Sequence, residues 1–411
     1  MSSERDGLDS AKVIWVVCVA IALLFFARGA FLPYVFPLFE GLDPGLDYGQ
    51  IALILNGYIL AQSLFAPLAG WLADKTSVRS ALLLAIGLGG GSFLVIASAP
   101  GFAVCATMIF LAGMAFVLGK IALNSLLVLN SSPEMLRSSV ARRATLLNLG
   151  SFLGNSLALR SLGLWGAKVH ALLLAGLALP LALGFLADPK SQAAAAPKKS
   201  SWCLGDAKDL LRKQSFLADA LRRFAMVLPY GCWGTVIPKY AIDRYGCNDP
   251  VWTIGLVSLL TTLLGAHLLS VHLSKKLYSL GFKWEWWSMC SVLCYCAGLL
   301  LLSFVPSPVF LPLAIAVFIC GEVLMTPCFD ETAKKHSHAA SMGTCMGLLH
   351  LVDGAGRLLG AAFALGLYGL LRGGDWASCF WLIAVAVFLT VSSLLHLLAS
   401  RLAASAKGSP R

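Results

Sequence analysis

Long runs of predominantly apolar residues recur along the whole chain, separated by short segments rich in glycine, proline or charge. A helix needs about 20 apolar residues to cross the hydrocarbon core of a bilayer. Only 12% of the 411 residues are charged, against about 25% in ordinary soluble domains, so the chain cannot cover a globule with hydrated side chains. Disordered chains are poor in apolar residues, whereas 58% of these residues are hydrophobic. The pattern predicts an all-α membrane protein that crosses the bilayer many times.

The apolar runs predict twelve transmembrane helices in two groups of six. The expected spans are residues 12–39, 49–72, 80–99, 102–129, 139–160, 168–187, 216–241, 250–273, 285–305, 308–329, 342–370 and 375–399. The polar, basic segment between the groups predicts a flexible linker that ends in a short amphipathic helix, Asp206 to Lys213, on the membrane surface. We therefore expect an N-terminal six-helix bundle in residues 1–187, a cytoplasmic linker in 188–215 and a C-terminal six-helix bundle in 216–411.

The basic residues indicate how the chain is oriented. With the N-terminus inside, 23 of the 31 lysine and arginine residues fall in inner loops and tails, five in outer connections and three inside spans. Lysine and arginine are enriched on the cytoplasmic side of membrane proteins. We expect both termini in the cytoplasm and the protein in the plasma (or cytoplasmic) membrane. Topology accounts for the net charge of +11, so no nucleic-acid partner is expected.

The loop between the second and third spans carries a motif. Residues 70–79 read Gly-Trp-Leu-Ala-Asp-Lys-Thr-Ser-Val-Arg. This loop resembles the signature of the major facilitator superfamily, Gly-x-Leu-Ala-Asp-Arg-x-Gly-Arg-(Arg/Lys), with matches at Gly70, Leu72, Ala73, Asp74 and Arg79. Lys75 and Ser77 replace the usual arginine and glycine. The glycine permits close helix contact, and the aspartate is suited to the N-terminus of a neighbouring helix and to Arg79.

The resemblance implies two pseudo-symmetric six-helix bundles that expose a central site to each side of the membrane in turn. In the family, the signature loop steadies one conformation of that cycle. Residues 343–347, Gly356-Arg357 and Gly321-Glu322 look like the eleventh and tenth spans of drug-transporter-like members. Two features of drug–proton antiporters are missing, because Ile109 stands where the fourth-span arginine is usual and the fifth span lacks the usual proline and paired glycines.

Two cations lie deep inside expected spans and mark a candidate binding site. Arg28 falls near the middle of the first span, and Lys120 lies in the fourth, with Asn124 one turn later on the same helix face. A cation at the centre of a bilayer costs at least about 2.5 kcal/mol, so it should face water, an internal partner or a substrate. We expect these three residues to contact substrate. Tyr230 and Trp233 are candidate aromatic walls, although aromatic residues in spans more often serve packing.

Two carboxylates, Glu322 and Asp353, lie inside the tenth and eleventh spans. Asp353 and Arg357 are one turn apart, so we expect them to pair on one helix face as structural or gating residues, like the signature loop. Glu322 is the candidate proton-coupling residue, because a desolvated carboxylate takes up a proton more readily. His350, on the face of Asp353, is a second candidate. Alternatively, the two carboxylates lock the two central cations permanently.

The leading functional hypothesis is a secondary active or facilitative transporter that moves a small organic solute by alternating access. The two central cations favour a solute with an anionic group. One alternative is a drug–proton antiporter that exports hydrophobic compounds, and another is a non-transporting receptor or scaffold with the same fold. We expect no enzyme activity, cofactor or bound metal, because no catalytic or ligand spacing is readable. The protein is expected to be a monomer.

Overall fold

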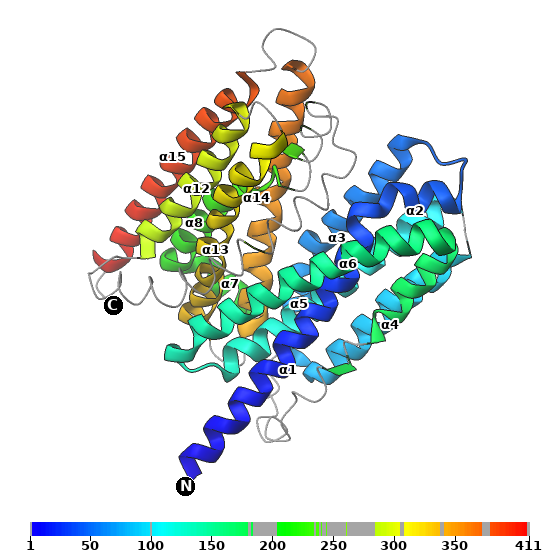
Figure 1. Ribbon diagram of the computed structural model, residues 1–411. Coiled ribbons are helices and arrows are strands. Elements are labelled where there is room, and N and C mark those ends of the chain that lie inside the picture. The colour runs from blue at the N-terminus through cyan, green and yellow to red at the C-terminus, as the bar shows by residue number, and fades with distance from the viewer. Residues whose placement is uncertain are drawn as a thin grey trace. The chain divides into compact units, whose positions relative to one another are not determined.

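The computed structural model is built from α-helices (Figure 1). It describes residues 2–98, 101–179, 182–183, 204–233, 236–237, 240, 244, 260, 284–304, 308–337, 341–371 and 379–408. None of these residues lies in a β-strand. Within them, eight helices are long and apolar enough to cross a membrane, or up to nine if a bent pair counts as one span. The predicted all-α membrane fold is confirmed. The predicted eighth span, 250–273, lies outside the described residues apart from Leu260.

The chain divides into two compact units, of which the first is Met1–Asp206 with Ser337–Leu351 and the second is Ala207–His336 with Val352–Arg411. The first unit contains α1 (Ser2–Phe31), α2 (Val35–Leu42), α3 (Tyr48–Lys75), α4 (Val78–Ala97), α5 (Phe102–Asn130) and α6 (Pro133–Gly176). The second contains α7 (Leu204–Arg212), α8 (Gln214–Tyr230), α12 (Trp284–Phe304), α13 (Leu311–His336) and α15 (Phe380–Gly408). Helix α14 (Met342–Leu371) contributes its first part to the first unit and the rest to the second.

Polar side chains cap the starts of two helices in the first unit, which fixes where the short connections before them end. Asp47 accepts a hydrogen bond from the Gln50 amide at 2.8 Å, and the Gln50 side chain accepts one from the Asp47 amide at 3.0 Å, which forms a capping box before α3. Ser77 caps α4 by accepting from the amide of Ser80 at 3.1 Å. The serine that replaces the usual glycine of the signature loop therefore starts the next helix.

The predicted first span, 12–39, is interrupted. Helix α1 ends at Phe31, a single 3₁₀ turn covers Leu32–Tyr34, and α2 follows. Pro33 has no amide hydrogen for the helical ladder, which explains the position of the break. Beside it, Nε2 of the buried His170 donates to the carbonyl of Ala30 at 3.0 Å, and Nδ1 lies 2.6 Å from the Ser161 hydroxyl. The break is therefore a local effect of Pro33, and a buried side chain bonds to a carbonyl beside it.

The predicted fifth and sixth spans, 139–160 and 168–187, fall on α6, in which two helices follow one another across a sharp kink. Its parts Ser138–Ala158 and Arg160–Gly176 lie at 84° to each other. Gly166 has a φ of 77°, a conformation that residues with a Cβ rarely adopt. The connection expected at 161–167 is therefore helical on either side of a turned glycine, and the described part of the second span ends earlier than predicted.

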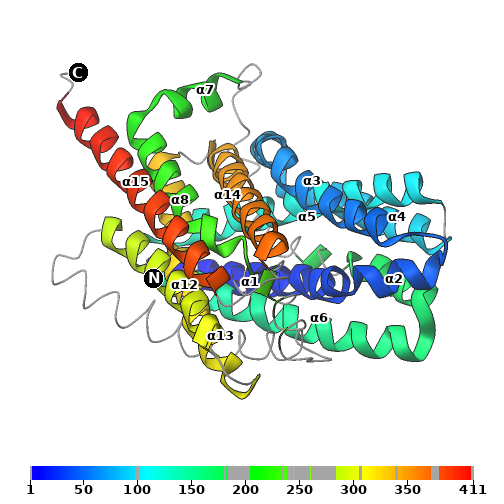
Figure 2. The same cartoon turned by 90° about the horizontal axis from the view of Figure 1, so that it is seen from above.

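Glycines set the closest helix contacts of the first unit. A Cβ at Gly150 would overlap the Ala22 carbonyl, one at Gly154 would overlap that of Phe26, and one at Gly29 would overlap that of Ser151. Helix α1 therefore lies against α6 along its length, while α3 and α4 flank α5 (Figures 1 and 2).

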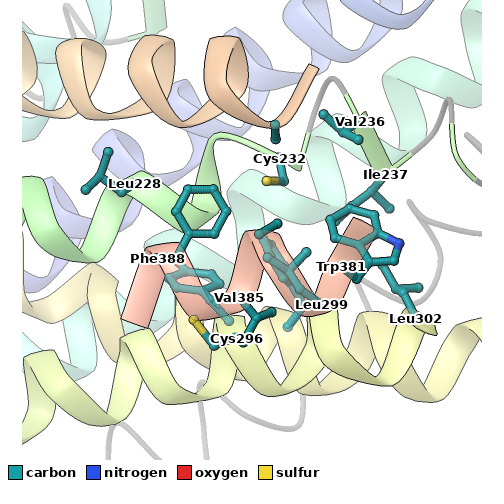
Figure 3. Packing of buried hydrophobic residues seen from close by; sticks show 14 of the residues in the cluster. Leu228, Cys232, Val236, Ile237, Cys296, Leu299, Leu302, Trp381, Val385 and Phe388 are labelled. Atoms are coloured by element: carbon teal, nitrogen blue, oxygen red, sulfur yellow. The ribbon is translucent and has the colours of Figure 1, made fainter. Parts of the chain in front are cut away.

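The core of the second unit is aromatic and aliphatic. Helix α12 packs beside α13, and α8 packs beside α15. Figure 3 shows Phe388 and Trp381 of α15 facing Leu299 and Cys296 of α12. The segment after α8 adds Cys232, which is fully buried. The predicted amphipathic helix 206–213 is observed as α7, with Leu210 buried and Lys208, Asp209 and Arg212 exposed.

Candidate functional site

The first unit brings its two predicted cations to one pair of aromatic rings. The Arg28 Cζ atom lies 5.4 Å from the ring centres of both Phe25 and Phe116. The Lys120 Nζ atom lies 6.0 Å from the ring centre of Phe25. The two rings meet edge to face, with centres 5.3 Å apart. Residues from α1 and α5, about 90 positions apart in sequence, therefore form one cluster, in which the ring faces attract both cations. We call these four residues the N-unit cluster.

Asn124 lies beside this cluster but has a protein partner. Its side-chain oxygen accepts a hydrogen bond from Nη1 of Arg143 at 3.1 Å, and both residues are buried. Arg143 was counted among the 23 basic residues of the inner loops and tails when the orientation of the chain was predicted, whereas the structure places it inside α6. The available signal was that Arg142 and Arg143 both fall within the expected span 139–160. Arg142 is exposed and lies over the ring of Trp15, at 5.6 Å.

The signature loop contacts the start of α14, within the first unit. The Asp74 carboxylate accepts hydrogen bonds from the amides of Gly343 and Thr344, both at 2.6 Å, and from the Thr344 hydroxyl at 2.7 Å. A Cβ at Gly70 would overlap the carbonyl of Gly343. The expected contact of Asp74 with a helix N-terminus is therefore present, and the free amides of that terminus supply its donors. Arg79 is exposed in the first turn of α4.

The second unit gathers four predicted residues into another cluster. The Tyr230 hydroxyl donates to Glu322 Oε1 at 3.3 Å. The Arg357 Cζ atom lies 4.6 Å from the ring centre of Tyr230. Trp233 stacks on Phe318, with ring centres 5.4 Å apart and planes 12° from parallel. We call Tyr230, Trp233, Phe318, Glu322 and Arg357 the C-unit cluster.

The predicted pair of Asp353 with Arg357 is wrong. Asp353 accepts two hydrogen bonds from Arg223, at 2.6 Å from Nε and 2.8 Å from Nη2, and Nη1 of Arg223 donates to the carbonyl of Met325 at 2.9 Å. Both side chains are less than a tenth exposed. A bidentate pair across two helices satisfies the planar guanidinium better than a contact along one helix does. The sequence reasoning missed Arg223 because it was counted at the cytoplasmic end of the seventh span.

A second ion network, buried except for the exposed Lys335, lies near the start of α8. Asp219 accepts from Arg222 at 2.9 Å, from Lys335 at 2.7 Å and from His336 at 2.8 Å. These residues were not predicted as site residues, and the network ties the beginning of α8 to the end of α13. His350, the second candidate for proton coupling, lies in the part of α14 that belongs to the first unit, whereas Glu322 lies in the second.

The long apolar helices define a polytopic membrane protein. A family model described as Major Facilitator Superfamily matches residues 17–361. The chain therefore belongs to the Major Facilitator Superfamily, a family of membrane transporters. The crystal structure of the human organic anion transporter MFSD10 (TETRAN) is similar, with a TM-score of 0.66, 20% identity, and coverage of 96% of this chain and 99% of that chain. This likeness shows a common fold. No match is found among curated proteins.

Proposed function

We propose that this protein is a secondary transporter that moves small organic anions by alternating access. The observation that carries the proposal is the N-unit cluster, in which Arg28 and Lys120 approach the same ring, that of Phe25. Two cations within one apolar bundle repel each other, and an anion between them relieves that repulsion. MFSD10, with the same fold, is described as an organic anion transporter, which agrees with the proposal.

The free energy of the cation–ring contacts, compared with the cost of placing a cation inside the bilayer, favours an anionic solute. A cation–π contact contributes about 0.5–2 kcal/mol, whereas placing a cation at the bilayer centre costs at least about 2.5 kcal/mol. The rings of Phe25 and Phe116 therefore offset part of the cost of Arg28. A bound carboxylate or similar group would add charge-assisted hydrogen bonds, which are stronger than a contact with a ring face.

The signature loop supports alternating access. Asp74 holds the N-terminus of α14 through three hydrogen bonds, and α14 continues into the second unit. Release of those bonds frees one end of a helix that both units share. We infer that Gly70, Asp74 and Arg79 serve conformational gating rather than substrate contact.

We also infer that both termini are cytoplasmic and that the protein acts as a monomer. If the buried Arg143, Arg222 and Arg223 are set aside, 20 of the 23 inner lysine and arginine residues remain, against five outside. The bias for a cytoplasmic location of those loops is therefore preserved.

The test uses the full chain in proteoliposomes and two dyes with the same xanthene skeleton. We expect uptake of anionic fluorescein and none of a cationic rhodamine ester. Arg28→Ala and Lys120→Ala should each reduce fluorescein uptake more than tenfold, whereas Arg142→Ala, which removes an exposed arginine that also lies over an aromatic ring, should leave it unchanged.

Undiminished fluorescein uptake in both cluster variants would remove Arg28 and Lys120 from the site. Transport of the cationic dye alone, driven by a pH gradient, would favour the drug–proton antiporter. Transport of neither dye nor any other solute, with a correctly folded protein, would favour the receptor or scaffold.

A further inference from the structure

Arg357 differs from the other arginines inside the second unit. Arg222 pairs with Asp219 and Arg223 pairs with Asp353. Arg357 has no carboxylate partner among the described residues, and its buried Nε atom has no hydrogen-bond partner there. Its contact is the ring of Tyr230, 4.6 Å from Cζ. A ring face replaces only part of the hydration that a guanidinium loses when it leaves water.

The surroundings of Arg357 form an aromatic shelf. Phe318 lies nearly parallel to Tyr230, at 19° with ring centres 6.2 Å apart, and nearly parallel to Trp233, at 12°. Phe318 is 1% exposed and Tyr295 behind it is fully buried. Tyr230, Trp233 and Arg357 are each partly exposed. The shelf therefore combines two buried rings, Phe318 and Tyr295, with the partly accessible rings of Tyr230 and Trp233 beside the arginine.

Close backbone contacts hold the two sides of this arrangement together. A Cβ at Gly360 would overlap the carbonyl of Leu228, and one at Gly231 would lie 2.5 Å from the carbonyl oxygen of Arg357. The end of α8 therefore lies directly against α14. The contact is made by Gly231, which follows Tyr230, and by the backbone of Arg357. These contacts fix the backbone segments that carry the cation and the ring.

We propose that Arg357, Tyr230 and Trp233 form a subsite for an aromatic carboxylate. The guanidinium binds the carboxylate with its planar pair of donors, and the ring of the solute packs against Trp233. Tyr230 holds the guanidinium from the face of its own ring. This inference rests on the proposed transport of organic anions and narrows the solute to acids with an aromatic ring. It also gives Arg357 a binding role in place of the structural pairing that the sequence predicted.

The experiment measures binding of naphthoate to the full chain in lipid nanodiscs by equilibrium dialysis. Naphthamide serves as the neutral analogue and decalin carboxylate as the saturated one. The variants are Arg357→Gln, Arg357→Lys and Trp233→Leu. The matched control is Arg244→Gln, because Arg244 is an exposed arginine that also lies over a tyrosine ring, that of Tyr240 at 5.9 Å.

We expect wild type to prefer naphthoate over both analogues. Arg357→Gln should weaken naphthoate binding at least about tenfold while leaving naphthamide binding unchanged, since bonds to a charged group are lost. Arg357→Lys, which keeps the charge without the planar fork, should retain part of the preference and guards against a folding defect in the first variant. Trp233→Leu should weaken naphthoate and naphthamide alike, and Arg244→Gln neither.

Wild-type naphthoate affinity in both Arg357 variants would overturn the subsite. If the N-unit variants then still lost fluorescein uptake, the proposed function would stand without it. Equal affinity of wild type for naphthoate and decalin carboxylate would also overturn the aromatic shelf. Failure of the wild-type protein to bind or transport any organic anion would instead overturn the proposed function, and the subsite with it.

Discussion

Replacement of Asp353 with alanine leaves the guanidinium of Arg223 without its carboxylate partner inside the second unit. The carboxylate accepts two short hydrogen bonds, at 2.6 and 2.8 Å, and the two side chains are 6% and 7% exposed. Removal of one partner of a buried ion pair costs about 3–5 kcal/mol, because the remaining charge keeps its desolvation penalty. The carbonyl of Met325 remains as an acceptor for Nη1, at 2.9 Å, but it carries no charge. We therefore expect Asp353→Ala to lower the free energy of unfolding by about 3–5 kcal/mol.

The paired substitution separates the lost charge from lost packing. Replacement of Arg223 with methionine and Asp353 with leucine removes both charges and keeps apolar volume. Such exchanges are often neutral or stabilising by about 1–4 kcal/mol. We expect the double variant to be at least as stable as wild type, whereas each single variant is strongly destabilised. Asp209→Ala, an exposed aspartate of α7, should change the free energy of unfolding by no more than about 0.5 kcal/mol.

The assay is unfolding of the purified full chain in mixed micelles, titrated with dodecyl sulfate and followed by circular dichroism. A double-mutant cycle over the four proteins gives the interaction free energy of the pair. A loss below about 1 kcal/mol in Asp353→Ala, or a double variant as unstable as the single one, would refute the reasoning. The first result would show that water or another group reaches Arg223, and the second that packing decides the stability.

Three further predictions concern the helix contacts and the proton. Asp74→Ala removes the acceptor of three hydrogen bonds at the start of α14, so we expect more than tenfold slower fluorescein uptake at normal expression, with normal uptake as the contrary result. Gly70→Ala should lower the free energy of unfolding by about 1–3 kcal/mol, because the new Cβ overlaps a backbone carbonyl. The control Gly57→Ala, with open space around the new Cβ, should not lower it. Equal effects of the two substitutions in the micelle assay would contradict this. If Glu322 takes up a proton with the anion, wild-type uptake should rise as the external pH falls, while Glu322→Gln should make uptake independent of pH; an unchanged pH profile would exclude that role. The charged and titratable groups around Glu322 in the C-unit cluster and its back wall are Tyr230, Tyr295 and Arg357.

Much of the fold was predictable, because length and hydropathy dictate a membrane helix almost by themselves. The run 102–129 appears as α5, and the run 285–305 as α12, within a few residues of their predicted ends. The break in the first span falls at Pro33, because proline acts locally on the backbone. The connection predicted between the fifth and sixth spans contains the non-helical Gly166, although so short a turn leaves little trace in hydropathy.

The candidate site was predictable in its residue types and less so in its pairings. Intramembrane charge is rare enough to single out Arg28, Lys120 and Glu322. The partner of Asp353 could not be read, because Arg223 lies 130 positions away and the contact depends on how two helices are packed. Helical spacing suggested Arg357 as the partner, because it is the nearest cation on the same helix. Spacing along one helix cannot show that Arg223, on another helix, reaches Asp353 with both of its donors.

The sequence by itself determined that the chain is a polytopic helical membrane protein with a signature loop, because apolar length, charge placement and local turn chemistry act over a few residues at a time. Only the tertiary structure decided which cation meets which anion or ring. It joined Asp353 to Arg223, placed Arg28 and Lys120 on the same aromatic pair, and left Arg357 on Tyr230. Those pairings depend on directional contacts between helices far apart in the chain, and these exist only after the helices have packed.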